Sequence, residues 1–212
     1  DPLGSFDPLH LDKVFPAVAR PYKAHYLVDL DRDPAELGTA HHRRNARRCG
    51  RHATFSVCQQ PLDHVDEWTT LYRQLTERHA VTGIARFSRE AFAQQLGLPG
   101  VFLVQAVGQD GDLLGMQLWF TETDKAWHHL SGYSPAGYRH GGVSYGLMAF
   151  ALAELHGRGA VVADLGAGAG LEADETDGLS RFKRGWSTRT KEAWLCGAVL
   201  DAELYGRLAG KQ

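Results

Sequence analysis

Several features that mark particular classes of protein are scarce in this sequence. Its 212 residues hold three cysteines, Cys49, Cys58 and Cys196, and none of them stands in a CxxC pair. A sparse and odd set of this kind argues against a disulfide framework and fits a reducing compartment, so we expect a cytoplasmic protein. No apolar run reaches the roughly 18 residues that a membrane-spanning helix needs. We expect no signal peptide at the start of this sequence, and we interpret Asp1–Ser5 as a remnant of an expression vector.

An excess of charge of one sign is missing as well. Lys and Arg number 23 against 25 Asp and Glu, which leaves a formal net charge of -2. No global field would therefore attract a nucleic acid, and any such binding must rest on a local patch. Zinc-ligand spacing and the serine or cysteine nucleophile signatures are also absent, so we predict neither a metal site nor a covalent enzyme intermediate.

Hydrophobic residues make up 43% of the chain, which is enough for one packed domain. Residues 1–40 carry several prolines, and we expect there an irregular arm with one short strand at 25–30, followed by a domain over 41–212. Alternating patterns and short apolar runs predict further strands over 53–57, 101–107, 113–120, 126–132, 160–165 and 194–200. Helical patterns and capping residues predict helices over 61–79, 88–96, 143–156, 180–185 and 201–208. A three-stranded meander followed by a strand–helix–strand crossover predicts an α/β (α+β) fold, with a mixed sheet covered by helices.

The glycine-rich stretch DLGAGAG over 164–170 admits two interpretations. It resembles the first motif of S-adenosylmethionine-dependent methyltransferases, in which glycines let a nucleotide approach the backbone at the end of a strand. That motif opens its domain, whereas most of this chain precedes the stretch. We therefore favour a loop that lets a substrate approach the sheet, and keep the methyltransferase as a minor alternative.

Taken in order, four segments resemble the GNAT acyltransferase superfamily, and in particular its FemAB-like and cellulose-biosynthesis-type branch. They are HHRRNARR at 41–48, DEWTTLYRQLTERH at 66–79, HHLSGYSP at 128–135, and DLGAGAG with GLSRFKRGW within 164–186. The resemblance implies a GNAT-like central sheet, mixed but mostly antiparallel and flanked by helices. It also implies transfer of an acyl group from acyl-CoA to a small-molecule amine by direct attack. An enzyme of the FemAB type would instead take an aminoacyl group from aminoacyl-tRNA.

The resemblance assigns a donor site to the loop that precedes the long apolar helix. In GNAT enzymes this loop cradles the pyrophosphate of coenzyme A with backbone N–H groups at the start of a helix. The residues at the matching positions here are Arg139, Gly141, Gly142 and Ser144. The basic run at 41–52 has two interpretations: it neutralises phosphates of a tRNA acceptor stem, or it is a solvated helix face.

The same resemblance points to Lys183, which stands in a Phe-Lys-x-x-Trp setting. It implies that the lysine ammonium stabilises the oxyanion of a tetrahedral intermediate, with Phe182 and Trp186 as apolar walls. The alternative is a surface lysine at the end of a helix. Transfer to an amine also needs a base. His128 and His129 are adjacent on a strand and point to opposite faces, so one of them can reach the substrate, or each is simply a hydrogen-bonded residue of the sheet.

Acceptor binding is predicted at an acidic loop and at the end of the meander. The carboxylates of Glu172 and Asp177 suit a cationic amine, and Tyr133 follows the last strand of the meander. A solvated loop is the alternative for these carboxylates. We predict an enzyme of the acyltransferase class that needs no metal. A GNAT-like binding module without catalysis stays open as an alternative, because the pyrophosphate loop departs from the strict pattern.

Overall fold

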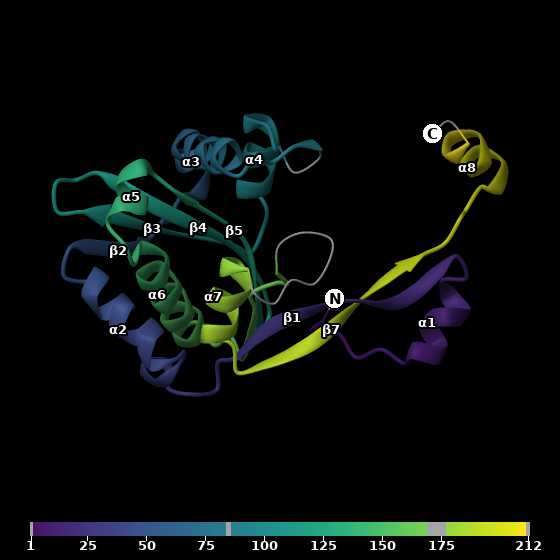
Figure 1. The fold of residues 1–212 in the computed structure, drawn as a ribbon, viewed down its shortest axis with the longest axis horizontal. Coiled ribbons are helices and arrows are strands. Elements are labelled where there is room, and N and C mark those ends of the chain that lie inside the picture. The colour runs from purple at the N-terminus through teal and green to yellow at the C-terminus, as the bar shows by residue number, and fades with distance from the viewer. Residues whose placement is uncertain (1, 84–85, 169–176, 211–212) are drawn as a thin grey trace.

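The structure, a computed structural model, describes residues 2–83, 86–168 and 177–210 (Figure 1). Over these residues one sheet holds seven strands in the order β2-β3-β4-β5-β6-β1-β7. Their bounds are Val18–Asp29 for β1, Ala53–Val57 for β2, Val101–Gly108 for β3, Leu113–Glu122 for β4, Lys125–Tyr133 for β5, Val162–Asp164 for β6 and Arg189–Gly197 for β7. Every neighbouring pair is antiparallel except β5 and β6, which are parallel. The predicted α/β sheet, mixed but mostly antiparallel, is thus confirmed.

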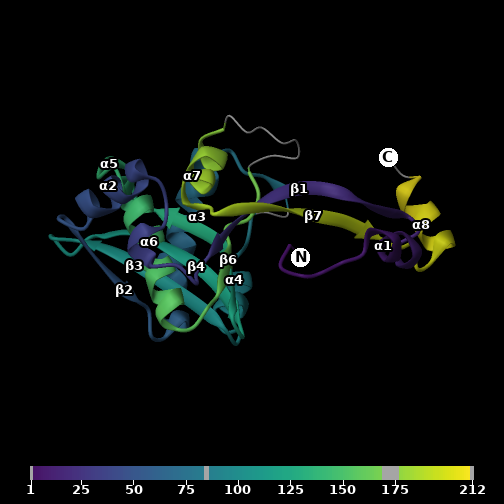
Figure 2. The same ribbon diagram turned by 90° about the horizontal axis from the view of Figure 1, so that it is seen from below.

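Helices cover both faces of this sheet (Figures 1 and 2). One face carries α2 (Ala40–Cys49), α6 (Val143–Gly157) and α7 (Gly178–Trp186). The other face carries α3 (Val65–Arg78) and α4 (Arg89–Leu96). The remaining short helices are α1 (Pro8–Val14), η1 (Pro34–Glu36), η2 (Pro61–His64), α5 (Pro135–Arg139) and α8 (Ala202–Ala209). The sheet therefore lies between two helical layers.

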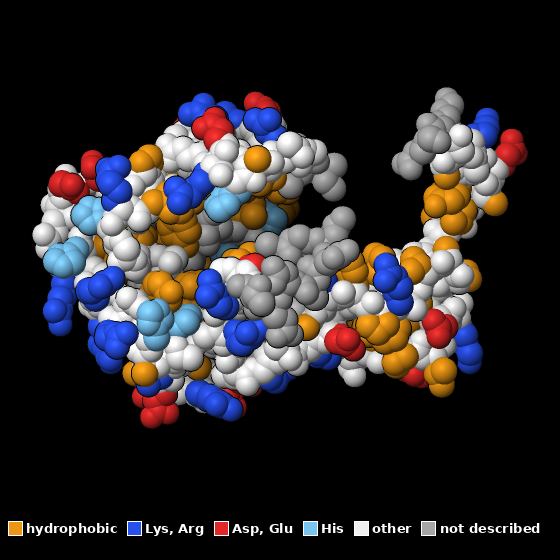
Figure 3. Space-filling model, in the orientation of Figure 1, with side chains coloured by type: hydrophobic (Ala, Val, Ile, Leu, Met, Phe, Trp, Pro, Cys, Tyr) orange, Lys and Arg blue, Asp and Glu red, His pale blue; other side chains and the backbone are white. Residues whose placement is uncertain are grey.

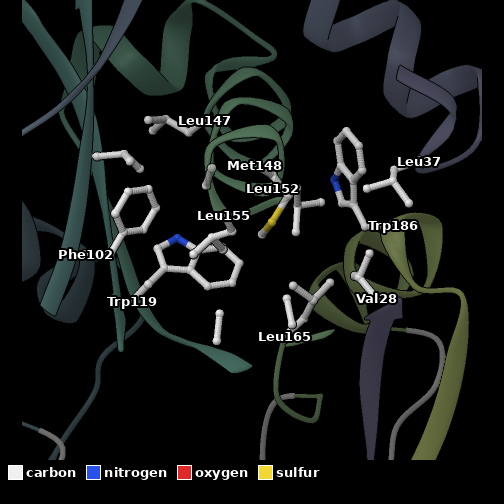
Figure 4. Close-up of a cluster of buried hydrophobic side chains, with 14 of the residues drawn as sticks. Val28, Leu37, Phe102, Trp119, Leu147, Met148, Leu152, Leu155, Leu165 and Trp186 are labelled. Atoms are coloured by element: carbon white, nitrogen blue, oxygen red, sulfur yellow. The ribbon is translucent and has the colours of Figure 1, made fainter. Parts of the chain in front are cut away.

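Each face of the sheet has its own apolar core. Under α6, Phe102 and Trp119 of the meander share one core with Leu152 and Leu155 of the helix (Figure 4). Under α3 and α4, the buried rings of Trp68 and Phe92 pack edge to face. Burying one such side chain contributes about 1.5–3 kcal/mol to the free energy of unfolding, so packing on both faces stabilises the meander. The strands of the meander are therefore a rigid support for the side chains that they carry.

The N-terminal part differs from the prediction of an irregular arm. β1 begins at Val18 instead of His25, and its outer part pairs with β7 alone. Proline disfavours a strand interior, but Pro21 lies at a register shift in this pairing. Prolines are tolerated at bulges and in edge strands. β7 likewise begins at Arg189 and not at Trp194. The prediction missed the first residues of this strand because they are exposed and show no apolar alternation. The pairing of distant segments has overridden the local pattern in both strands.

The outer parts of β1 and β7 leave the sheet as a two-stranded ribbon, with α1 and α8 at its far end (Figures 1 and 2). The last helix matches the prediction within two residues, although none of its residues is buried. Exposed apolar side chains occur at the far end of this ribbon, among them Leu9, Leu200 and Leu208. The split described below lies at the other end of β1, where the ribbon joins the body of the sheet.

A glycine lets α7 pack closely against α2. A Cβ placed on Gly185 would lie 1.9 Å from the His42 ring. That ring cannot turn away freely, because Nε2 donates to the carbonyl oxygen of Phe182 (3.1 Å) and Nδ1 accepts from the hydroxyl of Thr39 (2.7 Å). The α2–α7 contact therefore requires a residue without a side chain at this position.

We expect Gly185→Ala to lower the free energy of unfolding by about 1–3 kcal/mol, because an added methyl group forces the two helices apart. Chemical denaturation measures this loss. Gly178→Ala in the same helix is the matched control, since nothing lies within 4 Å of its Cβ position. Alanine is the better helix former, so this control should be neutral or more stable by up to about 1 kcal/mol. Equal losses in both variants would contradict the close α2–α7 packing.

Candidate active site

β5 and β6 run together for only three residue pairs, Lys125–Trp127 with Val162–Asp164. β6 then ends, whereas β5 continues through His128–Tyr133 with β4 on one side and, among the described residues, no strand on the other. The two segments therefore part, and one edge of β5 faces a split in the sheet. Figure 3 shows the surface hollowed between α4 and α7, with histidine side chains in the hollow.

Lys183 of α7 lies beside the loop that follows β6, at this split. Its charge contributes to the lowered pKa of His128 on β5, and the carboxylate of Asp164 on β6 favours the charged ammonium. The residue is 8% exposed, and Nζ donates to the carbonyl oxygen of Ala167 (2.7 Å). Nζ also lies 3.2 Å from the Cβ position of Gly166, whose φ of +77° is a second reason for glycine there. Lys183 is therefore buried, and the alternative of a surface lysine is wrong.

The surroundings of Lys183 tune its proton affinity. Burial lowers the pKa of the ammonium to about 8, the carboxylates of Asp164 and Asp177 oppose this shift, and the charge of Lys23 adds to it. Most of the lysine is therefore protonated at neutral pH, in a place largely closed to water. A fixed cation in such a place strongly stabilises negative charge that develops on a nearby oxygen.

Both ends of α7 are fixed, and they hold Lys183 in place. At the first end, the Asp177 carboxylate accepts hydrogen bonds from the backbone N–H (2.9 Å) and the hydroxyl of Ser180. The hydroxyl bond lowers the pKa of Asp177. At the other end, Trp186 is 2% exposed within the α6 core, and Phe182 packs partly buried against it. Asp177 thus acts as a helix cap and Trp186 as a packing anchor, roles that the sequence did not predict for them.

The two adjacent histidines of β5 point to opposite faces of the sheet. His128 lies on the α6 face, with its ring 4.9 Å from that of Trp119 and Nε2 2.8 Å from the Ser131 hydroxyl. Burial and the charge of Lys183 lower the pKa of His128 to about 3, so it is neutral at physiological pH and a weak base. His129 lies on the α4 face within an aromatic cluster, and burial lowers its pKa too.

A third histidine stands at the split, and sequence reasoning missed it. His25 Nδ1 of β1 lies 2.9 Å from Oδ2 of Asp164, and the two side chains are 23% and 5% exposed. The Asp164 carboxylate also accepts from the N–H of Gly166 (2.7 Å). The sequence offers a signal for Asp164, a carboxylate at the end of a buried strand. It offers none for His25, which lies 139 positions away in the chain.

The predicted pyrophosphate loop lies beside the basic helix α2. α6 begins after Gly142, which has a φ of +106° and no side-chain cap, so the first N–H groups of the helix are open to a ligand. Ser144 is the second residue of α6, and the Arg48 guanidinium lies 3.7 Å from the Cβ position of Gly141. A cavity of about 330 Å³ opens here, lined by Arg48, Cys49, His52, Ala53, Leu114, Arg139, His140 and Gly141. Lys and Arg side chains gather over α2 (Figure 3). The structure thus joins two features that the sequence predicted separately.

Tyr133, the last residue of β5, lines a neighbouring cavity of about 460 Å³. The full lining is Gln74, Arg78, Tyr133, Pro135, Tyr138 and Arg139. The Arg78 guanidinium lies 4.2 Å from the centre of the Tyr138 ring. Arg139 therefore borders both cavities. Glu172, the other predicted acceptor contact, lies outside the described residues.

Two further findings concern metals and membranes. Among the residues that the structure describes, no three His, Cys, Asp or Glu side chains come together as a metal site requires. Within the same residues, each helix falls short of the length and apolar character that a bilayer crossing demands.

Comparisons with known proteins agree with this geometry. The family model described as an acetyltransferase (GNAT) domain matches residues 38–184. Among solved structures, the chain is similar to FemX, with a TM-score of 0.69 and 13% identity over 89% of this chain and 64% of FemX. It is similar to a domain named as the C-terminal domain of a lysylphosphatidylglycerol synthetase from Agrobacterium fabrum (TM-score 0.70, 18% identity, 95% of this chain, 67% of the other). It also resembles L-PGS from Bacillus licheniformis (TM-score 0.65, 17% identity, 92% and 68%). The chain thus spans less than two thirds of FemX, and no curated protein sequence matches it.

The lowered pKa of Lys183 makes stability depend on pH in a defined direction. Between about pH 8 and the ordinary value of 10.5, the unfolded chain holds a proton on this lysine that the folded protein has lost. The free energy of unfolding should therefore rise with pH in this window, by up to about 3 kcal/mol relative to Lys183→Met. Denaturant titrations on both sides of the window measure it, with the exposed Lys13→Met as control. A wild type that tracks Lys183→Met at every pH would contradict a buried cation.

Proposed function

Because the chain belongs to the acetyltransferase (GNAT) domain family, we propose that it transfers an acyl group to an amine at the split between β5 and β6. The observation that carries the proposal is Lys183, a buried ammonium held by the loop that follows β6 at the split. The amine nitrogen attacks the carbonyl carbon of the donor directly, within a ternary complex. The carbonyl oxygen then becomes an oxyanion, and the ammonium of Lys183 stabilises it.

Three properties of Lys183 support this role. Its hydrogen bond to the Ala167 carbonyl fixes the position of Nζ before any substrate binds, so little reorganisation is needed. Phe182 and Trp186 place apolar surface around α7, which keeps the local dielectric low and strengthens the interaction. Its pKa of about 8 leaves the group protonated at neutral pH. A cation with these three properties is suited to stabilise an oxyanion.

We propose acyl-CoA as the donor, bound with its pyrophosphate at the first turn of α6. Open N–H groups and the positive end of the helix favour an anion there. The flanking Arg48 and Arg139 add two charges that phosphate groups prefer. Gly141, Gly142 and Ser144 keep this turn small enough for close approach of the ligand.

The acceptor is proposed to be a small-molecule amine that reaches the split from the side of Tyr133. The amine must lose a proton during the attack, so a base is required. His128 and His129 are the bases that the sequence predicts. The pKa of about 3 makes His128 a poor proton acceptor, and His129 faces the α4 core.

Aminoacyl-tRNA is the second candidate donor, and one observation favours it. Arg48 of α2 lines the cavity at the α6 turn, and Arg44 and Arg47 belong to the same helix, so this surface suits the phosphates of an acceptor stem. The fold shared with FemX is compatible with either donor. The two donors differ in how binding responds to salt. Release of several counterions makes tRNA binding fall steeply as the salt concentration rises.

A thermal-shift titration with acetyl-CoA tests the donor site. Binding should raise the Tm by mass action, and Gly142→Val should abolish the shift because a side chain blocks the first turn of α6. Arg48→Ala should reduce it. Gly159→Val is the matched control: Gly159 also has a positive φ, it lies just beyond the other end of α6, and nothing lies within 4 Å of its Cβ position. If no CoA thioester stabilises the protein and aminoacyl-tRNA binds in a salt-dependent way, the CoA donor is wrong.

Steady-state kinetics test Lys183. Loss of one donor to an oxyanion typically costs about 3 kcal/mol, so Lys183→Ala should lower kcat by roughly a hundredfold. The shift in Tm caused by acetyl-CoA should persist in this variant, because the lysine acts on the transition state. Lys183→Arg should restore the rate only in part, since a planar guanidinium does not copy a compact charge. An alanine variant with unchanged kcat would refute the role of Lys183.

A further inference from the structure

His25 and Asp164 form a histidine–carboxylate pair at the split. His25 Nδ1 lies 2.9 Å and 3.1 Å from the two carboxylate oxygens of Asp164. Asp164 is the last residue of β6, and β1 pairs with β6 only as far as Leu27. His25 therefore stands beyond the last pair, beside the loop that follows β6. We propose that His25 is the general base of the transfer and that Asp164 positions it, an inference that rests on the acyl transfer proposed above.

The hydrogen bond to Asp164 selects the tautomer of the His25 ring. A carboxylate only accepts hydrogen bonds, so Nδ1 carries the proton and Nε2 of the neutral ring keeps its lone pair. No described residue hydrogen-bonds to Nε2. The His25 side chain is 23% exposed and that of Asp164 is 5% exposed, so the ring is open to a ligand while its partner is buried. A base held by a buried carboxylate in this way is ready to accept a proton.

One short loop, residues 165–167, connects the His25 pair to Lys183. Tyr26, next to His25 in β1, exchanges two backbone hydrogen bonds with this loop, of 2.9 and 3.1 Å. The N–H of Gly166 donates to Asp164 (2.7 Å), and the following carbonyl accepts from Lys183 Nζ (2.7 Å). The proposed base and the cation for the oxyanion are therefore held in register by the same three residues.

The other histidines beside the split are less suited to this task. Nε2 of His128 is hydrogen-bonded to the Ser131 hydroxyl. Burial and the charge of Lys183 lower the pKa of His128 to about 3. His129 points into the aromatic cluster on the α4 face, away from Lys183. Of these three histidines, only His25 has a carboxylate bound to one ring nitrogen while the other ring nitrogen has no hydrogen-bond partner among the described residues.

The step balances in atoms and charge. The neutral amine attacks the donor carbonyl carbon, a C–N bond forms, and the carbonyl oxygen takes up the negative charge beside Lys183. His25 Nε2 accepts the proton that the nitrogen loses, and the imidazolium is stabilised by Asp164. Collapse of the intermediate restores the carbonyl and breaks the bond to the sulfur of CoA. That sulfur leaves as a thiol with the proton returned by His25.

Chemical rescue of His25→Ala tests the proposal in the full chain. With acetyl-CoA as donor and glycinamide, benzylamine and lysinamide as acceptors, kcat should fall by a hundredfold or more, the usual contribution of a general base. The shift in Tm caused by acetyl-CoA should stay as in the wild type. Added imidazole should restore part of the rate in His25→Ala, because it can occupy the place of the ring. Asp164→Asn should lower kcat and not respond to imidazole.

His10→Ala, an exposed histidine of α1, is the matched control and should keep the wild-type rate with no response to imidazole. His25→Gln, which keeps a polar side chain of similar length, replaces the alanine variant for the rate measurement if that variant does not fold. A His25→Gln or His25→Ala enzyme with the wild-type kcat, or a His25→Ala enzyme whose lost rate imidazole does not restore, overturns the base assignment alone. No transfer by the wild type from any CoA thioester or aminoacyl-tRNA overturns the proposed function, and the assignment of His25 with it.

Discussion

The parallel pairing of β5 with β6 stops after three residues, and the rest of the site depends on this early end. Beyond Trp127, one edge of β5 has no strand beside it in the described part of the chain, and an edge of this kind must be covered or used. The loop 165–167 turns away to bond with β1, and its Ala167 carbonyl accepts from Lys183 of α7. If β6 continued along β5, this loop would not be available to hold the ammonium.

Holding a lysine in this place opposes folding, because burial favours the neutral amine. The rest of α7 compensates: Asp177 caps its start, Trp186 is buried in the α6 core, and Gly185 allows close contact with α2. A helix that served packing alone would place an apolar side chain at position 183. The arrangement therefore supports the proposed role of the ammonium in acyl transfer.

Local sequence patterns predicted the elements whose signals are local. The helix over 143–156 and the strands of the meander appear within about two residues, because apolar periodicity and turn residues lie inside the segments themselves. The prediction for β1 is too short. Its partner β7 lies far along the chain, and Pro21 interrupts the strand-like pattern of the residues around it. Lys183 was found through its motif, whereas His25 has meaning only through a contact with Asp164 that spans 139 positions. The local pattern was also misleading at Gly166, which resembles part of a methyltransferase motif. The structure explains this glycine by its positive φ and by the close approach of Lys183.

The protonation of Lys183 is the property from which the proposed chemistry follows, and nuclear magnetic resonance can observe it directly. A titration that follows the side-chain nitrogen of Lys183 in the intact protein should show a midpoint near the pKa of about 8 that burial imposes. Binding of acetyl-CoA should shift this midpoint, because the donor carbonyl and its charges then lie beside the ammonium. A midpoint at the ordinary value of 10.5, unmoved by any donor, would contradict a buried cation at the split.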